Sequence, residues 1–442
     1  MEITSLKLTN VRSIETAEFR FQPGFNLIAG VNGVGKSTVL DALRFCLSRI
    51  LTLTTKSRAK SLSFEKRDIR SGFPFLDAEL SLTISGSKLR FTRRQWREEF
   101  AADDEENLKK LRREILESER LRDRALNLLR ELEASHGVYD SDSFVPSKAR
   151  FLVADRMAEV APNGVFFSTN RSVVSSASTA KSRAAGGKSA AYAEALVPRR
   201  MYVAQFADWM RVQEALAKEQ NTAKQHLQVL RSAVKRFLPT YENLRPANEA
   251  DEKSSHLMIG QGKIELDVGQ LSDGERGVLA LVLDLARRLS QANPSLDDPL
   301  SEGHAVVLID ELDLHLHPKW QRQIVHNLTR TFPRCQFIAT THSPQVVASV
   351  EPDQVLLLAP NEIIHPDRSL GMDSNWILRH LMEADDRPEA AMVAIQSVEN
   401  LIEEGAFEEA HTAISKAKEN GLDLPEWSVL EARIARLEIL AK

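Results

Sequence analysis

The residues with the clearest chemical potential form a glycine-rich loop near the N-terminus. An apolar run at residues 25–29 leads into GVNGVGKST at residues 30–38, which fits the spacing G-x-x-x-x-G-K-S, and an amphipathic pattern follows. Between a strand and a helix, such a loop cradles phosphates with its backbone N–H groups, its lysine reaches the β- and γ-phosphates, and its serine hydroxyl binds Mg²⁺. The pattern therefore predicts a nucleotide site that includes Gly30, Asn32, Gly33, Gly35, Lys36, Ser37 and Thr38.

A pair of acids follows a second apolar run far along the chain. Residues 304–309 read HAVVLI and end at Asp310 and Glu311. An aspartate at the tip of a buried strand can hold Mg²⁺ beside the phosphate loop, and a neighbouring glutamate can act as general base toward the attacking water. We predict Ser37 and Asp310 as Mg²⁺ ligands and Glu311 as a catalytic residue of an ATPase.

Two further segments complete the predicted site. LSDGER at residues 271–276 precedes a strongly apolar helical pattern, which places Ser272 and Gly274 at a helix N-terminus, where anions bind. The apolar run QFIATT at residues 336–341 ends at His342. A histidine in this position is by itself more often an ordinary buried residue, and only its order after the other motifs favours a catalytic role.

The elements that must position these residues alternate between strands and helices. Continuous apolar strands in this order predict an α/β fold, with a sheet covered by helices on both faces. Residues 75–92 read as a hairpin. We divide the chain into an N-terminal ATPase lobe (1–100), a helical or coiled-coil insertion (101–245), a C-terminal ATPase lobe (246–372) and a helical tail (373–442).

The insertion has two distinctive stretches. Residues 103–135 carry a leucine stripe among many charges, which favours a short coiled coil over a solvated helix on its own domain. Residues 168–191 are rich in serine, alanine and glycine and predict a mobile loop. Its basic residues could contact phosphates of DNA or nucleotide, although a solvated loop is the favoured interpretation; they are Arg171, Lys181, Arg183 and Lys188.

The composition limits which other classes of protein this chain can belong to. The 442 residues carry a net charge of −4, so no global field attracts nucleic acid, and no apolar run is long enough for a membrane span. Cys46 and Cys335 are expected in the core, without a disulfide or zinc framework. His315 and His317 lack a third ligand, so metal binding there is not expected. These features predict a cytoplasmic protein.

The four motifs resemble those of ABC-type ATPases. LSDGER resembles their signature, which implies that Ser272, Asp273, Gly274 and Glu275 cap the γ-phosphate bound by a second subunit. His342 resembles the switch histidine that senses that phosphate, and Asp313 corresponds to the loop that couples the two sites. The stretch NVR at residues 10–12 and the sequence IDELDLHLHP extend the resemblance to the RecF/SMC/OLD-like branch, in which Arg12 would approach the phosphates. No clear glutamine loop is found, although residues 68–70 stand near its place.

Within that branch, several stretches resemble the PtuA-like ATPase subunit of Septu and retron-linked antiphage systems. They are YAEAL at 192–196, FADW at 206–209, LSDGERGVLALVLDLARRL and FPRCQFIATTHSPQVV. The resemblance implies a homodimer or higher homo-oligomer that uses ATP and Mg²⁺ and regulates a partner, typically an HNH-type nuclease. The alternative is a RecF- or SMC-like repair ATPase that binds DNA. An OLD-type nuclease is not expected, because Asp385 and Asp386 are adjacent rather than arranged as D-x-D.

Overall fold

The structure is a computed structural model. It describes residues 1–96 except 32, 56, 58 and 85, residues 160–247 except 170, 172 and 175–187, and residues 256–440 except 360, 361 and 386. The chain divides into two compact units, Met1–Asp373 and Ser374–Lys442, and each is described by itself.

A six-stranded mixed sheet forms the centre of the first unit. Its strand order is β15-β14-β3-β13-β12-β6. Only β15 runs antiparallel to its neighbour. The strands are β3 (Phe25–Ala29), β6 (Asn163–Phe167), β12 (Ala305–Ile309), β13 (Gln336–Thr340), β14 (Val355–Ala359) and β15 (Glu362–Ile364). Every residue of β3, β6, β12 and β13 is buried, as expected for parallel strands covered on both faces. The predicted α/β fold is confirmed.

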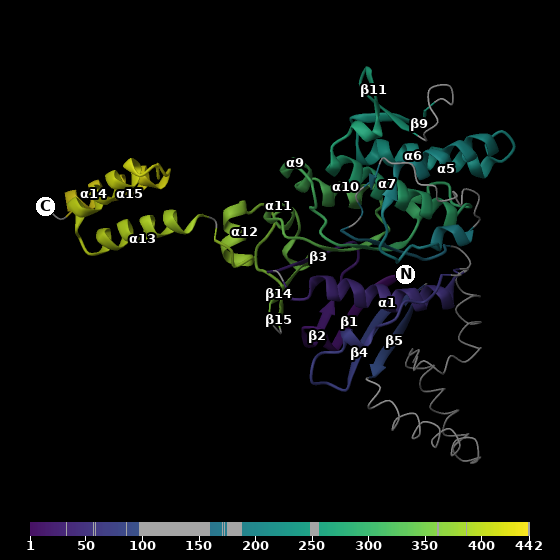
Figure 1. Cartoon of the computed structure of the whole chain (residues 1–442), viewed down its shortest axis with the longest axis horizontal. Coiled ribbons are helices and arrows are strands. Elements are labelled where there is room, and N and C mark those ends of the chain that lie inside the picture. The colour runs from purple at the N-terminus through teal and green to yellow at the C-terminus, as the bar shows by residue number, and fades with distance from the viewer. Residues whose placement is uncertain are drawn as a thin grey trace, which may run out of the picture. The chain divides into compact units, whose positions relative to one another are not determined.

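The first helix lies between this sheet and a second, antiparallel sheet (Figure 1). Helix α1 (Lys36–Thr54) packs on both, so that Leu43 and Leu47 share one core with Leu80 and Ile338. The second sheet has the order β2-β1-β4-β5. Its strands are β1 (Glu2–Val11), β2 (Ile14–Arg20), β4 (Phe75–Ile84) and β5 (Ser87–Trp96), which confirms the predicted hairpin.

Longer helices gather around α7 (Asp273–Ala292), which contacts β6 (Figure 1). Helix α6 (Asn221–Phe237) packs against α7, α5 (Val203–Leu216) and α10 (Ile324–Thr331). A three-stranded sheet, ordered β11-β10-β9, lies next to α5 and α6. Its strands are β9 (Tyr241–Pro246), β10 (Leu257–Gln261) and β11 (Ile264–Asp267).

Short elements connect these parts. They are η1 (Lys66–Asp68), β7 (Val173–Val174), η2 (Lys188–Tyr192), β8 (Met201–Tyr202), η3 (Val268–Gln270), α8 (Pro299–Glu302), α9 (Pro318–Gln321), α11 (Pro344–Val347) and η4 (Pro352–Gln354). Strands β7 and β8 pair in parallel.

The predicted insertion needs one correction. It was expected to be helical or coiled-coil over residues 101–245, with a mobile loop at 168–191, yet β6 lies within that range and forms the edge of the central sheet beside β12. The run NGVFF is too short for its hydrophobic periodicity to distinguish a strand from a helix. Its hydrogen-bonded pairing with β12 shows that it is a strand. Helices α5 and α6 lie within the same range and agree with its predicted helical character. The predicted coiled coil at 103–135 lies outside the described residues.

The second unit consists of helices, as predicted for the tail. They are α12 (Ser374–Leu381), α13 (Glu389–Glu403), α14 (Phe407–Glu419) and α15 (Glu426–Leu440). Trp427 is buried among side chains of α13 and α14, including Val398 and Ile414. Gly405 and Gly421 follow α13 and α14 with φ of 76° and 82°, the left-handed conformation that ends many helices. Within the described residues, no helix combines the length and apolar character needed to cross a bilayer.

Candidate active site

The predicted site residues meet at the carboxyl edge of the central sheet. Strand β3 ends at the phosphate loop, β12 ends at Asp310, and β13 lies between these two strands. Because parallel strands share their carboxyl edge, residues hundreds of positions apart converge. The Ser37 Oγ lies 3.4 and 3.5 Å from the two carboxylate oxygens of Asp310. The two predicted Mg²⁺ ligands are therefore neighbours.

Backbone conformation favours glycine at two positions of the phosphate loop, and close packing against backbone adds to this at the first. Gly30 has φ of 145°, and a Cβ there would lie 2.4 Å from the main-chain oxygen of Leu358 on β14. Gly35 has φ of 110°, and a Cβ there would meet the side chains of Ser13 and Ile14 at 3.3 Å. Neither conformation suits a residue with a side chain. Strand β14 and the turn after β1 thus fix the loop from two sides.

Lys36 begins α1 and is almost fully buried. Its Nζ donates hydrogen bonds to the main-chain oxygens of Gly30 and Val31, both at 2.8 Å. Burial lowers its pKa to about 8, against the opposing effect of Asp310 and Glu311. Since phosphate oxygens are stronger acceptors than carbonyls, a triphosphate would compete for this ammonium. Thr38 and Gly33 belong to the same segment, whereas Asn32 lies outside the described residues.

Thr340 connects the two acids that follow β12. Its hydroxyl donates to Asp310 Oδ1 at 2.8 Å and accepts from the Glu311 N–H, also at 2.8 Å. Glu311 has φ of 49°, a conformation uncommon outside glycine, asparagine and aspartate. The sequence pattern places Thr340 only within a strand, and its position at the end of β13, next to the strand that ends at the acids, is the signal for its role.

Arg171 was assigned to a solvated mobile loop, and this expectation is wrong. Its side chain is buried, and its guanidinium donates to the main-chain oxygens of Asp310 and Glu311, both at 2.5 Å. Ala191, the last residue of the same predicted loop, is buried as well. Arg171 follows the end of β6 by four residues. If β6 is read as a parallel strand, Arg171 is expected at the carboxyl edge of the central sheet. Lys188 is exposed, and Lys181 and Arg183 lie outside the described residues.

Asp313, which follows Asp310 and Glu311 in the chain, lies next to His342. The Asp313 Oδ1 accepts hydrogen bonds from the Thr341 hydroxyl at 2.5 Å and from the His342 N–H at 3.3 Å. His342 itself is half-buried. The residues predicted to couple the sites and to sense nucleotide are therefore joined by a hydrogen bond.

The LSDGER segment forms the N-terminus of α7. The Ser272 hydroxyl caps the helix by accepting from the Glu275 N–H, and the Glu275 carboxylate accepts from the Ser272 N–H at 3.1 Å. The Tyr241 hydroxyl donates to Glu275 at 3.0 Å, and burial together with this carboxylate raises the pKa of Tyr241 to about 12. Glu275 thus has a capping role, and Asp273 pairs with Arg276. Ser272 and Asp273 at the start of this 20-residue helix are exposed, whereas Gly274 is buried.

Arg12 is held by two carboxylates. Its guanidinium contacts Asp41 of α1 at 2.8 Å and Asp68 at 2.9 Å. Val11 also forms a β-bridge with Ile69. Residues 68–70, which stood near the expected glutamine loop, therefore support Arg12. Its approach to the phosphates stays a prediction.

The donor set at the edge fits Mg²⁺ better than a transition metal. The Ser37 hydroxyl and the Asp310 carboxylate offer oxygen, and Mg²⁺ is usually bound by few protein oxygens together with substrate phosphates and water. No group of three histidine, cysteine or acidic side chains gathers in the part of the chain that the structure describes. His317 instead caps α9 by accepting from the Lys319 N–H.

The mixed sheet, the phosphate loop and the acids at its edge define a P-loop ATPase head of the ABC type. The chain belongs to the family described as "AAA domain, putative AbiEii toxin, Type IV TA system", whose model matches residues 25–348. This range runs from the strand before the phosphate loop to the helix after His342.

Relatives refine this assignment. The "Retron Ec83 probable ATPase" of Escherichia coli is 40% identical over 163 residues, which cover 37% of this chain and 29% of the relative. "Septu protein PtuA" of Bacillus mycoides is 41% identical over 114 residues, which cover 26% and 15%. The resemblance to retron and Septu ATPases is confirmed, and the matches span less than a third of each relative. Among solved structures, the "SMC head domain from Thermotoga maritima" matches with a TM-score of 0.41 and 14% identity over 83% of this chain and 100% of that one.

Proposed function

We propose that this chain binds ATP with Mg²⁺ at the carboxyl edge of the central sheet and hydrolyses it. The observation that carries the proposal is that the Ser37 hydroxyl of the phosphate loop lies beside the Asp310 carboxylate, while the Thr340 hydroxyl bonds both Asp310 and the N–H of Glu311. Phosphoryl transfer needs positioned donors, a metal held by oxygen and a base for water, and these residues supply all three.

Each residue has a role in this scheme. Lys36 and the amides from Gly30 to Thr38 bind the phosphates, while Ser37 and Asp310 hold Mg²⁺. The bound ion neutralises charge on the phosphates. Glu311 accepts the proton of the attacking water, and His342 contacts the γ-phosphate. Asn32 stays a predicted contact.

We further propose that two copies of the chain close around two nucleotides. The exposure of Ser272 at the start of α7 supports this, since this helix N-terminus, with Gly274 beneath it, would offer an anion site to the nucleotide held by the other copy. Asp313, bonded to the His342 N–H, would connect the two sites across such a dimer. The lobes at 1–100 and 246–372, together with β6, would form this head.

The names of the relatives support a role in antiphage defence with a partner effector. We propose that the partner is an HNH-type nuclease and that the helical unit from residue 374 serves in docking. The relatives extend well beyond the matched segments, which cover 29% and 15% of their lengths.

A pair of variants tests the ATPase assignment. Lys36→Ala removes the phosphate-binding ammonium and should abolish nucleotide binding in calorimetry. Glu311→Gln keeps the phosphate contacts, so it should bind ATP and Mg²⁺, release little phosphate, and accumulate as a dimer in light scattering. If Glu311→Gln hydrolyses ATP at the wild-type rate, the assignment of the base is wrong.

The partner is tested by affinity purification from the native host with tagged Glu311→Gln protein and Lys36→Ala as control. A nuclease retained only by the first variant supports the defence role. Recovery of recombination or replication proteins, with salt-dependent binding of DNA, would favour the repair alternative.

A further inference from the structure

Arg171 is a buried cation whose described hydrogen bonds all go to main-chain oxygens. Besides Asp310 and Glu311 at 2.5 Å, it donates to Ser168 at 3.3 Å and Leu312 at 3.5 Å. Only 6% of the residue is exposed. A charge in such a place is costly unless its donors are satisfied. Burial lowers the pKa of the guanidinium to about 10, which leaves it protonated at neutral pH.

The contacts of Arg171 enclose the residue proposed as the base. Glu311 has φ of 49°, a conformation that persists only where neighbouring groups enforce it. Arg171 holds the carbonyls on both sides of the Glu311 Cα, and Thr340 holds its N–H. Fixing these two peptide planes fixes the direction of the Glu311 Cα–Cβ bond, and therefore the region that its carboxylate can reach.

Arg171 is itself anchored to the helix that starts at the LSDGER segment. Two residues after Arg171, β7 pairs with β8, so that Val173 lies beside Met201. Two residues before β8, Arg199 pairs with the buried Asp284 of α7. The same segment is therefore bonded at one end to the hydrolytic acids and at the other to α7.

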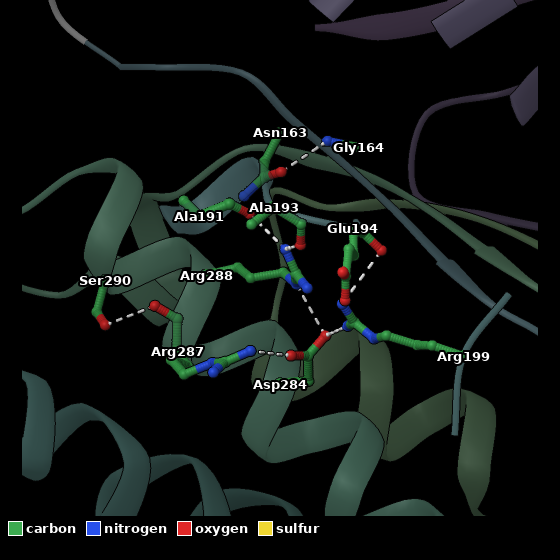
Figure 2. Close-up of polar contacts among 10 residues, drawn as sticks. All are labelled: Asn163, Gly164, Ala191, Ala193, Glu194, Arg199, Asp284, Arg287, Arg288 and Ser290. Carbon is green, nitrogen blue, oxygen red and sulfur yellow. Dashed lines mark hydrogen bonds and ion pairs between the residues drawn. The ribbon is translucent and has the colours of Figure 1, made fainter. Parts of the chain in front are cut away.

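A second set of contacts strengthens the α7 end. Arg288, also on α7, donates to the main-chain oxygens of Ala191 at 2.6 Å and Ala193 at 3.1 Å. Figure 2 shows the Asp284 carboxylate reached by Arg199, Arg287 and Arg288. We name the described residues 171, 173–174 and 188–202 the brace.

We propose that Arg171 is a positioning residue for hydrolysis, which holds Glu311 ready to accept the proton of the attacking water and ties it through the brace to α7. The inference rests on the proposed ATPase function. In that step the water oxygen bonds to the γ-phosphorus, the bond from this phosphorus to the β–γ bridging oxygen breaks, and Glu311 takes the proton.

Arg171→Lys tests this role with little change in charge. An ammonium can replace one contact, but it lacks the planar fork that reaches two separate carbonyls. We expect an ATP dissociation constant within about twofold of wild type and a kcat lowered about 10- to 100-fold, as displaced catalytic groups produce. Hydrogen exchange over residues 310–316 should rise. Arg245→Lys, at a partly exposed pair with Glu265, is the matched control and should leave both constants unchanged.

Combination with Glu311→Gln separates positioning from general loosening. If Arg171 acts through Glu311, the double variant should be no slower than Glu311→Gln alone. Three outcomes would overturn the inference. The first is a wild-type kcat in Arg171→Lys, and the second is a loss of ATP affinity as large as the loss of kcat. The third is a double variant whose kcat falls by the product of the two single effects. If the wild-type protein shows no turnover, the proposed function fails and takes the inference with it. If wild type and Arg171→Lys both hydrolyse ATP at the same rate, the inference fails while the proposed function stands.

Discussion

Gly274 lies directly against the main-chain carbonyl of His315, so close that a Cβ at residue 274 would come within 2.4 Å of that oxygen. This contact joins the start of α7 to the loop that follows the two acids. His315 itself has φ of 60°. The segment expected to meet a second nucleotide is therefore packed against the loop that follows the proposed base.

Gly274→Ala should disturb this contact. The added methyl group meets backbone rather than a flexible side chain, so we expect a loss of about 1–3 kcal/mol in unfolding free energy, together with lower ATP turnover. Gly277→Ala is the control on the same helix, where a Cβ meets nothing within 4 Å, and should be neutral or stabilising by about 0.5–1 kcal/mol. Equal melting temperatures for the two variants would contradict the packing described.

Thr340→Val should separate binding from hydrolysis. Valine fills the same space but leaves the Glu311 N–H without its acceptor, which costs about 1–3 kcal/mol in a buried setting. We expect ATP affinity close to wild type and a lower kcat in steady-state assays. Thr340→Ser keeps the hydroxyl and should retain most activity. Identical kinetics for the valine and serine variants would show that the hydroxyl does not position the acids.

Asp284→Asn should destabilise the fold strongly. Three guanidinium groups meet this buried carboxylate, and the charges hold its pKa well below the usual range despite burial. Removal of one partner from a buried ion pair costs about 3–5 kcal/mol, measured by denaturant unfolding.

Asp298→Asn is the matched control for that variant. Asp298 pairs with Arg236, and both side chains are more than a third exposed. A loss below about 1 kcal/mol is expected there. If the two substitutions cost the same, the arginine cluster on α7 contributes little to stability.

Cys46 should be inert in the folded protein. It is fully buried on α1, and burial raises its pKa to about 12. The folded state therefore binds the thiol proton more tightly than the unfolded state, and this contribution to stability is complete below about pH 9 and lost as the pH rises toward 12. A disulfide reagent at pH 8 should label neither Cys46 nor Cys335 until guanidinium is added.

The same labelling reports nucleotide binding. A ligand that binds only the folded state lowers the population of open forms. ATP with Mg²⁺ should therefore slow labelling of Cys46 in partly denaturing conditions, and should fail to do so in Lys36→Ala. Rapid labelling of the native protein would contradict the burial of the thiol.

The sequence by itself determined the elements with strong local signals. The spacing of glycines around Lys36, the apolar runs before Asp310 and His342, and the capping serine at residue 272 each depend on neighbours in the chain. Periodicity and spacing report such local chemistry directly. The α/β fold, the hairpin and the helical C-terminal unit followed from it.

Only the tertiary structure decided what Arg171 and Thr340 do. The role of Arg171 depends on β6 joining the sheet beside β12, and that of Thr340 on β13 lying between β3 and β12. The order of strands in the sheet brings together residues that are far apart in the chain, and no local sequence pattern predicts that order. The physical reason is that hydrogen bonds between strands are satisfied equally by many pairings, and only packing of the whole core selects one.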